Sequence, residues 1–195
     1  MNLNCSGWIA ALAAALSAVS CRCVSRPVAF DAAADEIAAL LRLIRENGNS
    51  VWWVGNGGSA AICSHLSHDL VNKLAIRSHV LTDPALMTCM ANDYGYGQAY
   101  VRSLQVLARP GDLVIAISSS GCSENILLVA DFARSRELSL VTLSGFATDN
   151  PLWRHEADVA LHIPSHWYGQ VEIGHEALLH AIVESLWGEE QRRRS

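Results

Sequence analysis

The sequence predicts an α/β fold in which a five-stranded parallel sheet lies between two layers of helices, in a three-layer sandwich preceded by a helical lead-in. Five short apolar segments lack polar–apolar alternation, helix-like segments separate them, and 51% of the residues are hydrophobic. Strands buried on both faces have this continuous apolar character, and intervening helices supply the crossovers that parallel strands require. We expect a single domain over residues 1–195, with the lead-in at 1–48 and the α/β core at 49–190.

The lead-in is expected to contain two helices, at about residues 7–20 and 31–47. The second carries its apolar residues at helical spacing. The first, "GWIAALAAALSAVSC", also has the length and small residues of a signal-peptide core, but no Lys or Arg precedes it. We favour an alanine-rich helix packed on other helices. No run of about 20 apolar residues exists, so no membrane span is expected.

The five strands are expected in the segments between the helical patterns. They are "VWWVG" (51–55), "HVLTD" (79–83), "DLVIAIS" (112–118), "LSLVTLSG" (138–145) and "DVALHIP" (158–164). An ambiguous stretch at 164–170 precedes a last helix that runs to about Glu190. Ligands of open parallel sheets bind beyond the carboxyl ends of the strands, so the loops at these ends are the candidate site.

Charge and cysteine content exclude several classes of protein. The net charge of -5 and the pI near 5.9 give no electrostatic basis for binding nucleic acid. The six cysteines are scattered, unlike a secreted disulfide framework, which predicts a cytoplasmic protein. Cys21 and Cys23 form a C-x-C without a second pair, so a zinc site there remains a minor alternative.

A glycine-rich loop, "GNGGS" at 55–59, follows the first predicted strand. Its glycines let the backbone approach a ligand, and the amides that open the next helix can receive an oxyanion. It is not a dinucleotide fingerprint, because the third glycine would fall at Ala60. A plain strand-to-helix turn is the alternative.

A second loop, "SSSGCS" at 118–123, follows the third predicted strand in the equivalent position. Its hydroxyls are neutral donors for a phosphate or a sugar. Both loops are expected at the same edge of the sheet. A phosphate held there without a Walker lysine indicates a small phosphorylated metabolite rather than a nucleoside triphosphate.

The helix after the first loop carries His65 and Asp69, four residues apart and therefore on one face. They lie beside the apolar row of that helix rather than in it, at the edge of the core, whereas His68 points away. Such a pair can ligate a metal or form a surface hydrogen bond.

The last predicted helix also carries polar groups where its pattern favours apolar ones. Glu172, His175, Glu176 and His180 can transfer protons or bind a metal. His180 is the best placed of the four for such a role. A hydrogen-bonded core histidine is the alternative for His180.

Taken together, the motifs "GNGGSAA…H…D", "ANDYGYG", "AISSSGCSEN", "TLSG" and "VE..H….H" resemble the sugar isomerase (SIS) domain family from about residue 30 to 188. Within it, the chain is similar to the phosphoheptose isomerases. These convert sedoheptulose 7-phosphate to D-glycero-D-manno-heptose 7-phosphate by aldose–ketose isomerisation. The resemblance implies a flavodoxin-like sheet and a homotetramer with active sites between subunits.

The resemblance also implies roles for individual residues. The sugar phosphate would be bound by Asn56, Gly57, Gly58, Ser59, Asn92, Asp93, Ser118, Ser119, Ser120 and Ser123. One Zn²⁺ per subunit would be held by His65, Asp69, Glu172 and His180. The acid and base groups would come from Asp69, Glu172 and His180.

Helix geometry constrains this ligand set. Eight residues of helix rise about 12 Å, so Glu172 and His180 cannot easily reach one metal from a continuous helix. Either the helix begins after Glu172, or the two ligands come from different subunits. The chain also departs from the family pattern, which usually has Glu at the position of Asp69 and Gln at that of Glu172.

Two other functions stay open. A non-catalytic SIS protein would bind a sugar phosphate or a replication-initiator partner with the serine loop but would not need the metal cluster. An isomerase of another phosphosugar is the second, because Cys122, Glu124, Gly169 and Gln170 differ from the usual family residues.

Overall fold

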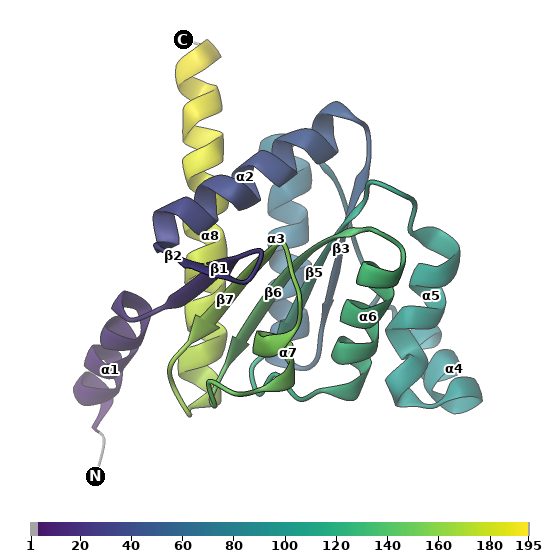
Figure 1. Ribbon diagram of the computed structural model, residues 1–195, viewed down its shortest axis with the longest axis horizontal. Helices are drawn as coiled ribbons and strands as arrows, with labels where there is room; N and C mark the ends of the chain where they lie inside the picture. The colour runs from purple at the N-terminus through teal and green to yellow at the C-terminus, as the bar shows by residue number, and fades with distance from the viewer. Residues whose placement is uncertain (1–3, 195) are drawn as a thin grey trace.

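The computed structural model describes residues 4–194 and contains a seven-stranded sheet between two layers of helices (Figure 1). The strands are β1 (Ser20–Cys23), β2 (Arg26–Val28), β3 (Ser50–Gly55), β4 (Arg77–Val80), β5 (Leu113–Ser118), β6 (Ser139–Gly145) and β7 (Val159–Ile163). The helices are α1 (Cys5–Ser17), α2 (Phe30–Glu46), α3 (Gly58–Leu74), α4 (Pro84–Tyr94), the 3-10 helix η1 (Tyr96–Gln98), α5 (Ala99–Leu107), α6 (Glu124–Ser135), α7 (Pro151–Arg154) and α8 (Tyr168–Arg194).

The five predicted strands form the parallel part of the sheet, in the order β4-β3-β5-β6-β7. Numbered along the chain, this is the flavodoxin-like order 2-1-3-4-5. The direction of the crossovers reverses between β3 and β5, which places the switch point where the two predicted anion loops begin. The predicted α/β class is therefore confirmed.

The expected count of five strands is too small, because a β1–β2 hairpin extends the sheet. β1 pairs antiparallel with both β2 and β7. Val24 and Ser25 form the two-residue turn, with φ of 45° and 67°. Positive φ at both positions is typical of a type I′ turn, which usually carries Asn-Gly. The absence of that signature hid the hairpin within a lead-in expected to be helical.

One parallel strand lies earlier than predicted. β4 ends at Val80, whereas the sequence predicted a strand that reached Asp83. The side chain of Asp83 accepts a hydrogen bond from the backbone N–H of Leu86 at 2.9 Å, and Pro84 is the first residue of α4. Asp83 is therefore the N-cap of a helix, which ends the extended segment before it.

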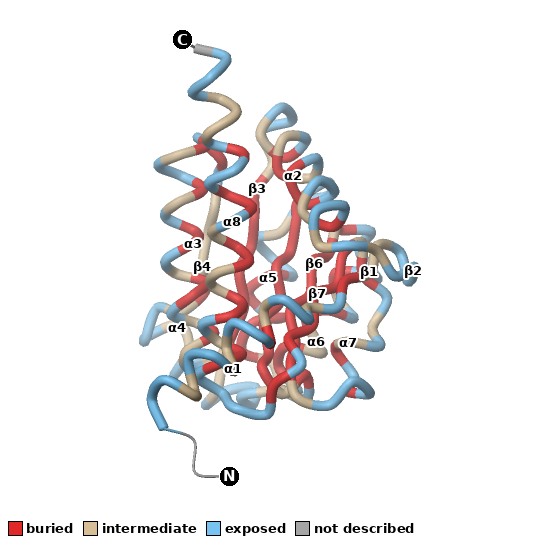
Figure 2. The backbone as a smooth tube through the Cα atoms, turned by 90° about the vertical axis from the view of Figure 1, so that its left-hand side faces the viewer, coloured by how far each residue is buried: buried red, intermediate tan, exposed pale blue. Residues whose placement is uncertain are grey.

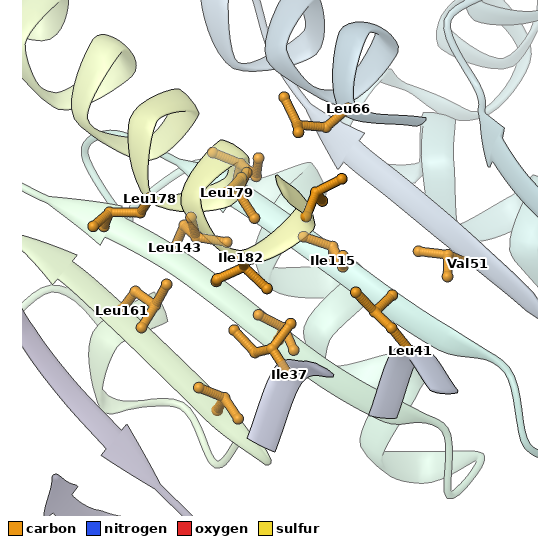
Figure 3. Close-up of a cluster of buried hydrophobic side chains, with 14 of the residues drawn as sticks. Ile37, Leu41, Val51, Leu66, Ile115, Leu143, Leu161, Leu178, Leu179 and Ile182 are labelled. Carbon is orange, nitrogen blue, oxygen red and sulfur yellow. The ribbon is translucent and has the colours of Figure 1, made fainter. Parts of the chain in front are cut away.

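Alternate residues of each central strand pack into different cores. On β5, Leu113, Ile115 and Ile117 face a core with α2, α3 and α8, whereas Val114 and Ala116 face a core with α5 and α6. Figure 3 shows Leu178, Leu179 and Ile182 of α8 against apolar residues of the strands. This packing fixes α8 across the sheet and so determines where its polar residues lie.

The N-terminal helix lies at the periphery. Figure 2 shows α1 coloured mostly as exposed or intermediate. Only Ala15 is buried among the residues of α1, and Ile9 is 62% exposed. Within residues 4–194, no helix combines the length and the apolar character needed to cross a membrane. Cys21 and Cys23 lie on β1 as free thiols, and burial raises the pKa of Cys21 to about 11. That shift disfavours the thiolate that zinc requires.

Candidate active site

A cavity of about 250 Å³ lies at the carboxyl ends of β3 and β5. It is lined by Asn56, Gly57, Gly58, Ser59, Ile117, Ser118, Ser119, Ser120, Ser123, Tyr168 and Glu172. Both predicted anion loops therefore contribute to one cavity, at the sheet edge where α8 begins (Figure 1). We call it the anion cavity.

The first loop delivers the N-terminus of α3 to the anion cavity. Gly57 caps the helix with φ of 54°, a conformation that favours glycine. Gly58 begins the helix, and a Cβ built on it would lie 2.5 Å from the Glu172 carboxylate. The absence of a side chain thus lets a carboxylate from α8 approach the backbone amides of α3, where the helix dipole favours negative charge.

Asn56 connects the two loops. Its side-chain amide exchanges two hydrogen bonds of 2.9 Å with Asn125 at the start of α6. The Tyr96 hydroxyl donates to Asn56 Oδ1 at 2.8 Å. These contacts fix the separation of the loops before any ligand binds, so part of the ordering cost of binding is already met.

The serine loop places hydroxyls at the cavity. Ser118 Oγ donates to Ser123 Oγ at 3.0 Å. Ser119 Oγ is buried and has no hydrogen-bond partner among the described residues. Gly121 has φ of 66°, and a Cβ there would lie 1.9 Å from Asn150 Oδ1, so only glycine fits this turn. A buried hydroxyl without a partner is costly unless a ligand pairs with it.

The anion cavity offers neutral donors. Of the residues that the structure describes, no Lys or Arg lines it. Glu172 is the one ionisable carboxyl in the lining, and burial raises the pKa of Glu172 above its usual value. A raised pKa lowers the cost of placing this carboxyl beside a bound anion, because it favours the neutral form.

A second group of side chains brings together His65 and Asp69 of α3 and His180 of α8. One ligand atom from each lies within 4.8 Å of the others, and the two histidine rings are 5.1 Å apart. His180 Nδ1 is buried, lies 3.5 Å from Asp69 Oδ2, and makes no hydrogen bond within residues 4–194. Two imidazoles and a carboxylate with an unpaired ring nitrogen fit a zinc site.

Asp69 also forms an ion pair with Lys73 of the same helix. Lys73 Nζ donates to Asp69 Oδ2 at 3.0 Å and to Glu184 Oε1 at 3.2 Å. A carboxylate has about four lone-pair positions, so this contact is compatible with a further ligand on Asp69.

Glu172 is not part of this three-residue group. α8 is continuous from Tyr168, so the alternative in which the helix begins after Glu172 is wrong. Glu172 and Gly58 do line a second cavity, of about 420 Å³, together with His65 and Glu176. Glu172 therefore lies between the anion cavity and the face that carries His65.

Two predicted substrate contacts lie elsewhere in the described chain. Asn92 and Asp93 are exposed at the end of α4, where Asn92 Nδ2 donates to Asp93 Oδ1 at 2.9 Å. Neither residue lines the anion cavity within one subunit. His68 is exposed, as its helix position predicted.

The His175 side chain lies in the core and makes a structural hydrogen bond. Its ring is fully buried, and Nε2–H donates to the backbone oxygen of Ser144 at 2.9 Å. Burial lowers the pKa of His175 to about 4. It is therefore a core histidine that attaches α8 to the end of β6, the alternative that the sequence had offered for His180.

Sequence reasoning missed four residues at the anion cavity. Ile117 and Tyr168 line it, while Asn125 and Tyr96 support it through Asn56. Asn125 and Tyr96 lie inside the quoted motifs "AISSSGCSEN" and "ANDYGYG", so their polar side chains beside loop glycines were available signals. Tyr168 had no such signal, because its role depends on where α8 begins.

Comparisons with known proteins agree on one family. The model of the SIS domain family matches residues 9–145. A phosphoheptose isomerase of Geotalea daltonii is 34% identical over 163 residues, which cover 77% of this chain and 82% of that protein. The phosphoheptose isomerase GmhA of Neisseria gonorrhoeae has the same fold, with a TM-score of 0.81 and 24% identity over 93% of this chain and 96% of that one. A phosphoheptose isomerase of Francisella tularensis has a TM-score of 0.73 and 27% identity, over 79% and 84% of the two chains.

Proposed function

This chain belongs to the SIS domain family, and from that membership we propose that it is an aldose–ketose isomerase. Its proposed reaction is the conversion of sedoheptulose 7-phosphate to D-glycero-D-manno-heptose 7-phosphate. The curated relatives that it matches over most of its length carry the name phosphoheptose isomerase. The proposal transfers their activity to this chain.

One observation supports the proposal most directly: Glu172 lines both the anion cavity and the cavity that contains His65. A phosphorylated sugar needs neutral donors for its phosphate and, some distance away, groups that exchange protons with its carbonyl end. The serine loop offers the first and the His65, Asp69 and His180 group offers the second. Glu172 lies between them, where the carbon chain would pass.

Isomerisation moves a hydrogen between adjacent carbons through an enediolate. A base removes the carbon-bound proton, and an acid protonates the carbonyl oxygen, after which the reverse transfers occur at the neighbouring atoms. We assign these transfers to Asp69, Glu172 and His180. Glu172 lines both cavities, and Asp69 and His180 form a group with His65, which lines the second cavity. The side chains of all three assigned residues can accept or donate a proton.

We assign one zinc ion per subunit to His65, Asp69 and His180, because their donor set fits that metal. When bound, zinc would polarise the sugar carbonyl and stabilise negative charge on its oxygen. Glu172 is proposed as a further ligand supplied from a neighbouring subunit. The reason for this proposal is that Glu172 and His180 are about 12 Å apart along the axis of the continuous α8, although Glu172 also lines the cavity that contains His65 of its own subunit.

A homotetramer with active sites between subunits is the assembly we propose. Asn92 and Asp93, exposed on one subunit, would then contact substrate in a neighbouring site. Variants Glu172→Ala and His180→Ala test this arrangement when each is inactive alone. Joint refolding of the two should restore part of the activity if a site combines residues of two subunits, and no restoration would contradict a shared site.

The test of function is direct. The purified protein is incubated with sedoheptulose 7-phosphate, with and without a chelator, and the products are identified by NMR. Formation of an aldoheptose 7-phosphate that zinc restores after chelation supports the proposal. Binding of the compound without conversion would instead favour a non-catalytic sugar-phosphate or partner-binding protein, and conversion of another phosphosugar only would change the substrate.

A further inference from the structure

We propose that Tyr168 is a specificity-determining residue, whose ring contacts the carbon chain of the phosphosugar, and that Phe146 is a positioning residue that holds this ring at the anion cavity. The inference rests on the proposed function and extends it to a residue that the motifs do not identify. Tyr168 is the first residue of α8, and it lies one helical turn before Glu172.

Tyr168 has the position of a substrate contact. It lines the anion cavity together with the serine loop, yet the residue is 60% exposed. A ring that both lines a cavity and remains exposed lies at the open edge of that cavity. Of the lining residues that the structure describes, only Tyr168 and Ile117 have large apolar side chains, and Ile117 is buried in β5.

The chemistry of the lining divides the anion cavity into two parts. The hydroxyls and amides of the two loops are suited to the phosphate oxygens. An aromatic ring is suited instead to the C–H groups of a carbon chain, as apolar surfaces in ligand sites generally are. Tyr168 therefore favours a phosphate that carries an extended carbon chain over a free phosphate ion.

Phe146 makes the contact that orients Tyr168. Their ring centroids are 4.7 Å apart with planes at 75°, an edge-to-face arrangement. Phe146 follows β6 with φ of 61°, in the left-handed region that bulky residues avoid. Its backbone N–H donates to the carbonyl oxygen of Ser165 at 3.0 Å, which fixes this conformation. Strained residues of this kind concentrate at ligand sites.

The turn before α8 is held at several other points. Ser165 Oγ donates to Gln170 Oε1 at 2.7 Å and accepts from the Trp167 N–H at 3.2 Å. Gln170 Nε2 in turn donates to the backbone oxygen of Trp8 at 3.2 Å. The backbone that carries Tyr168 is thus ordered in the free protein. Binding to an ordered ring loses less conformational entropy than binding to a mobile one.

The test compares Tyr168→Ala with Trp167→Ala by calorimetry, using sedoheptulose 7-phosphate and inorganic phosphate as separate probes. Trp167 is the matched control, because it is adjacent and 59% exposed but does not line the anion cavity. For Tyr168→Ala we expect an affinity for the sugar phosphate about five- to tenfold lower, with less than about a twofold change for inorganic phosphate. Trp167→Ala should leave both affinities unchanged.

Phe146 is tested by Phe146→Gly and Phe146→Tyr. Glycine accepts the left-handed φ without strain, which offsets part of the packing lost with the Phe146 ring at the edge of the core, so Phe146→Gly should stay folded while weakening sugar-phosphate binding as Tyr168→Ala does. Phe146→Tyr retains the ring and should retain affinity. In turnover, both Tyr168→Ala and Phe146→Gly should raise KM more than they lower kcat.

The outcomes separate this inference from the proposed function. Normal sugar-phosphate affinity in Tyr168→Ala, with the wild type binding the compound, overturns the inference and leaves the proposed function standing. Equal losses for sugar phosphate and inorganic phosphate overturn the assignment of Tyr168 to the carbon chain. A wild type that binds inorganic phosphate but not sedoheptulose 7-phosphate overturns the proposed function and, with it, this inference.

Discussion

The Glu172 carboxylate of α8 packs directly against Gly58, the first residue of α3, so closely that a Cβ on Gly58 would lie 2.5 Å from it. The two helices come from distant parts of the sequence, and both pack on the same face of the sheet. Their contact places an acidic group beside the helix N-terminus that opens the anion cavity. A substitution at Gly58 can therefore displace the Glu172 carboxylate without changing the Glu172 side chain itself.

Replacement of Gly58 by alanine should displace Glu172 while preserving the fold. Alanine is compatible with the helical backbone, and the atoms it meets are the flexible end of a side chain. We expect kcat/KM to fall by about tenfold or more, because small misplacements of reacting groups are costly. Gly188→Ala is the control, since its Cβ meets only ordinary contacts in α8 and activity should not change. Wild-type kcat/KM in Gly58→Ala would contradict a role for the Glu172 position.

Ser119→Ala should separate binding from stability. The variant removes a buried hydroxyl that has no partner among the described residues, so the melting temperature should stay the same or rise. Affinity for the sugar phosphate, measured by calorimetry, should fall by about tenfold, the effect of losing one hydrogen bond to a charged group. Ser103→Ala removes another buried hydroxyl without a described partner, on α5 and outside the anion cavity. It should change stability similarly but leave affinity unaltered.

His180→Ala should abolish both turnover and metal binding. We expect kcat to fall by about 10²- to 10⁴-fold, the usual contribution of a proton-transferring side chain. Zinc content measured by mass spectrometry should fall well below one ion per subunit, while the circular dichroism spectrum stays unchanged. His68→Ala is the control, because His68 is an exposed histidine of the same region and lies outside the three-residue group. Retained zinc and activity in His180→Ala would refute the assignment.

His175 should make stability depend on pH. Burial lowers its pKa from 6.5 to about 4 in the folded protein, so between these values the unfolded chain binds more protons than the folded one. Stability should therefore decrease as the pH falls from about 6.5 to about 4, by roughly 3 kcal/mol in total. Urea unfolding at several pH values measures this slope.

His175→Gln should flatten the same slope, because glutamine can still donate to Ser144 but does not titrate. His162, whose pKa burial also lowers, should contribute to the slope that remains. The exposed His68 provides the control, and His68→Gln should retain the wild-type slope. An unchanged slope in His175→Gln would show that other groups cause the acid sensitivity.

Local chemistry in the sequence was sufficient for much of the fold. The continuous apolar runs predicted the five parallel strands, since a strand buried on both faces has no polar side. The hairpin was not predictable in the same way. Its turn at Val24 and Ser25 takes positive φ at residues that do not favour it, and pairing with β7 stabilises it.

For the site, too, local sequence patterns predicted some features and tertiary packing decided the others. The sequence by itself determined the two anion loops and the His65–Asp69 pair, because glycines, serines and helical spacing act over a few residues. Tertiary structure alone decided that His180 joins that pair, that His175 is buried, that Glu172 faces Gly58, and that Tyr168 lines the anion cavity. These relationships depend on where α8 begins and how it packs across the sheet. That placement is set by apolar contacts between segments far apart in the chain, which no local pattern records.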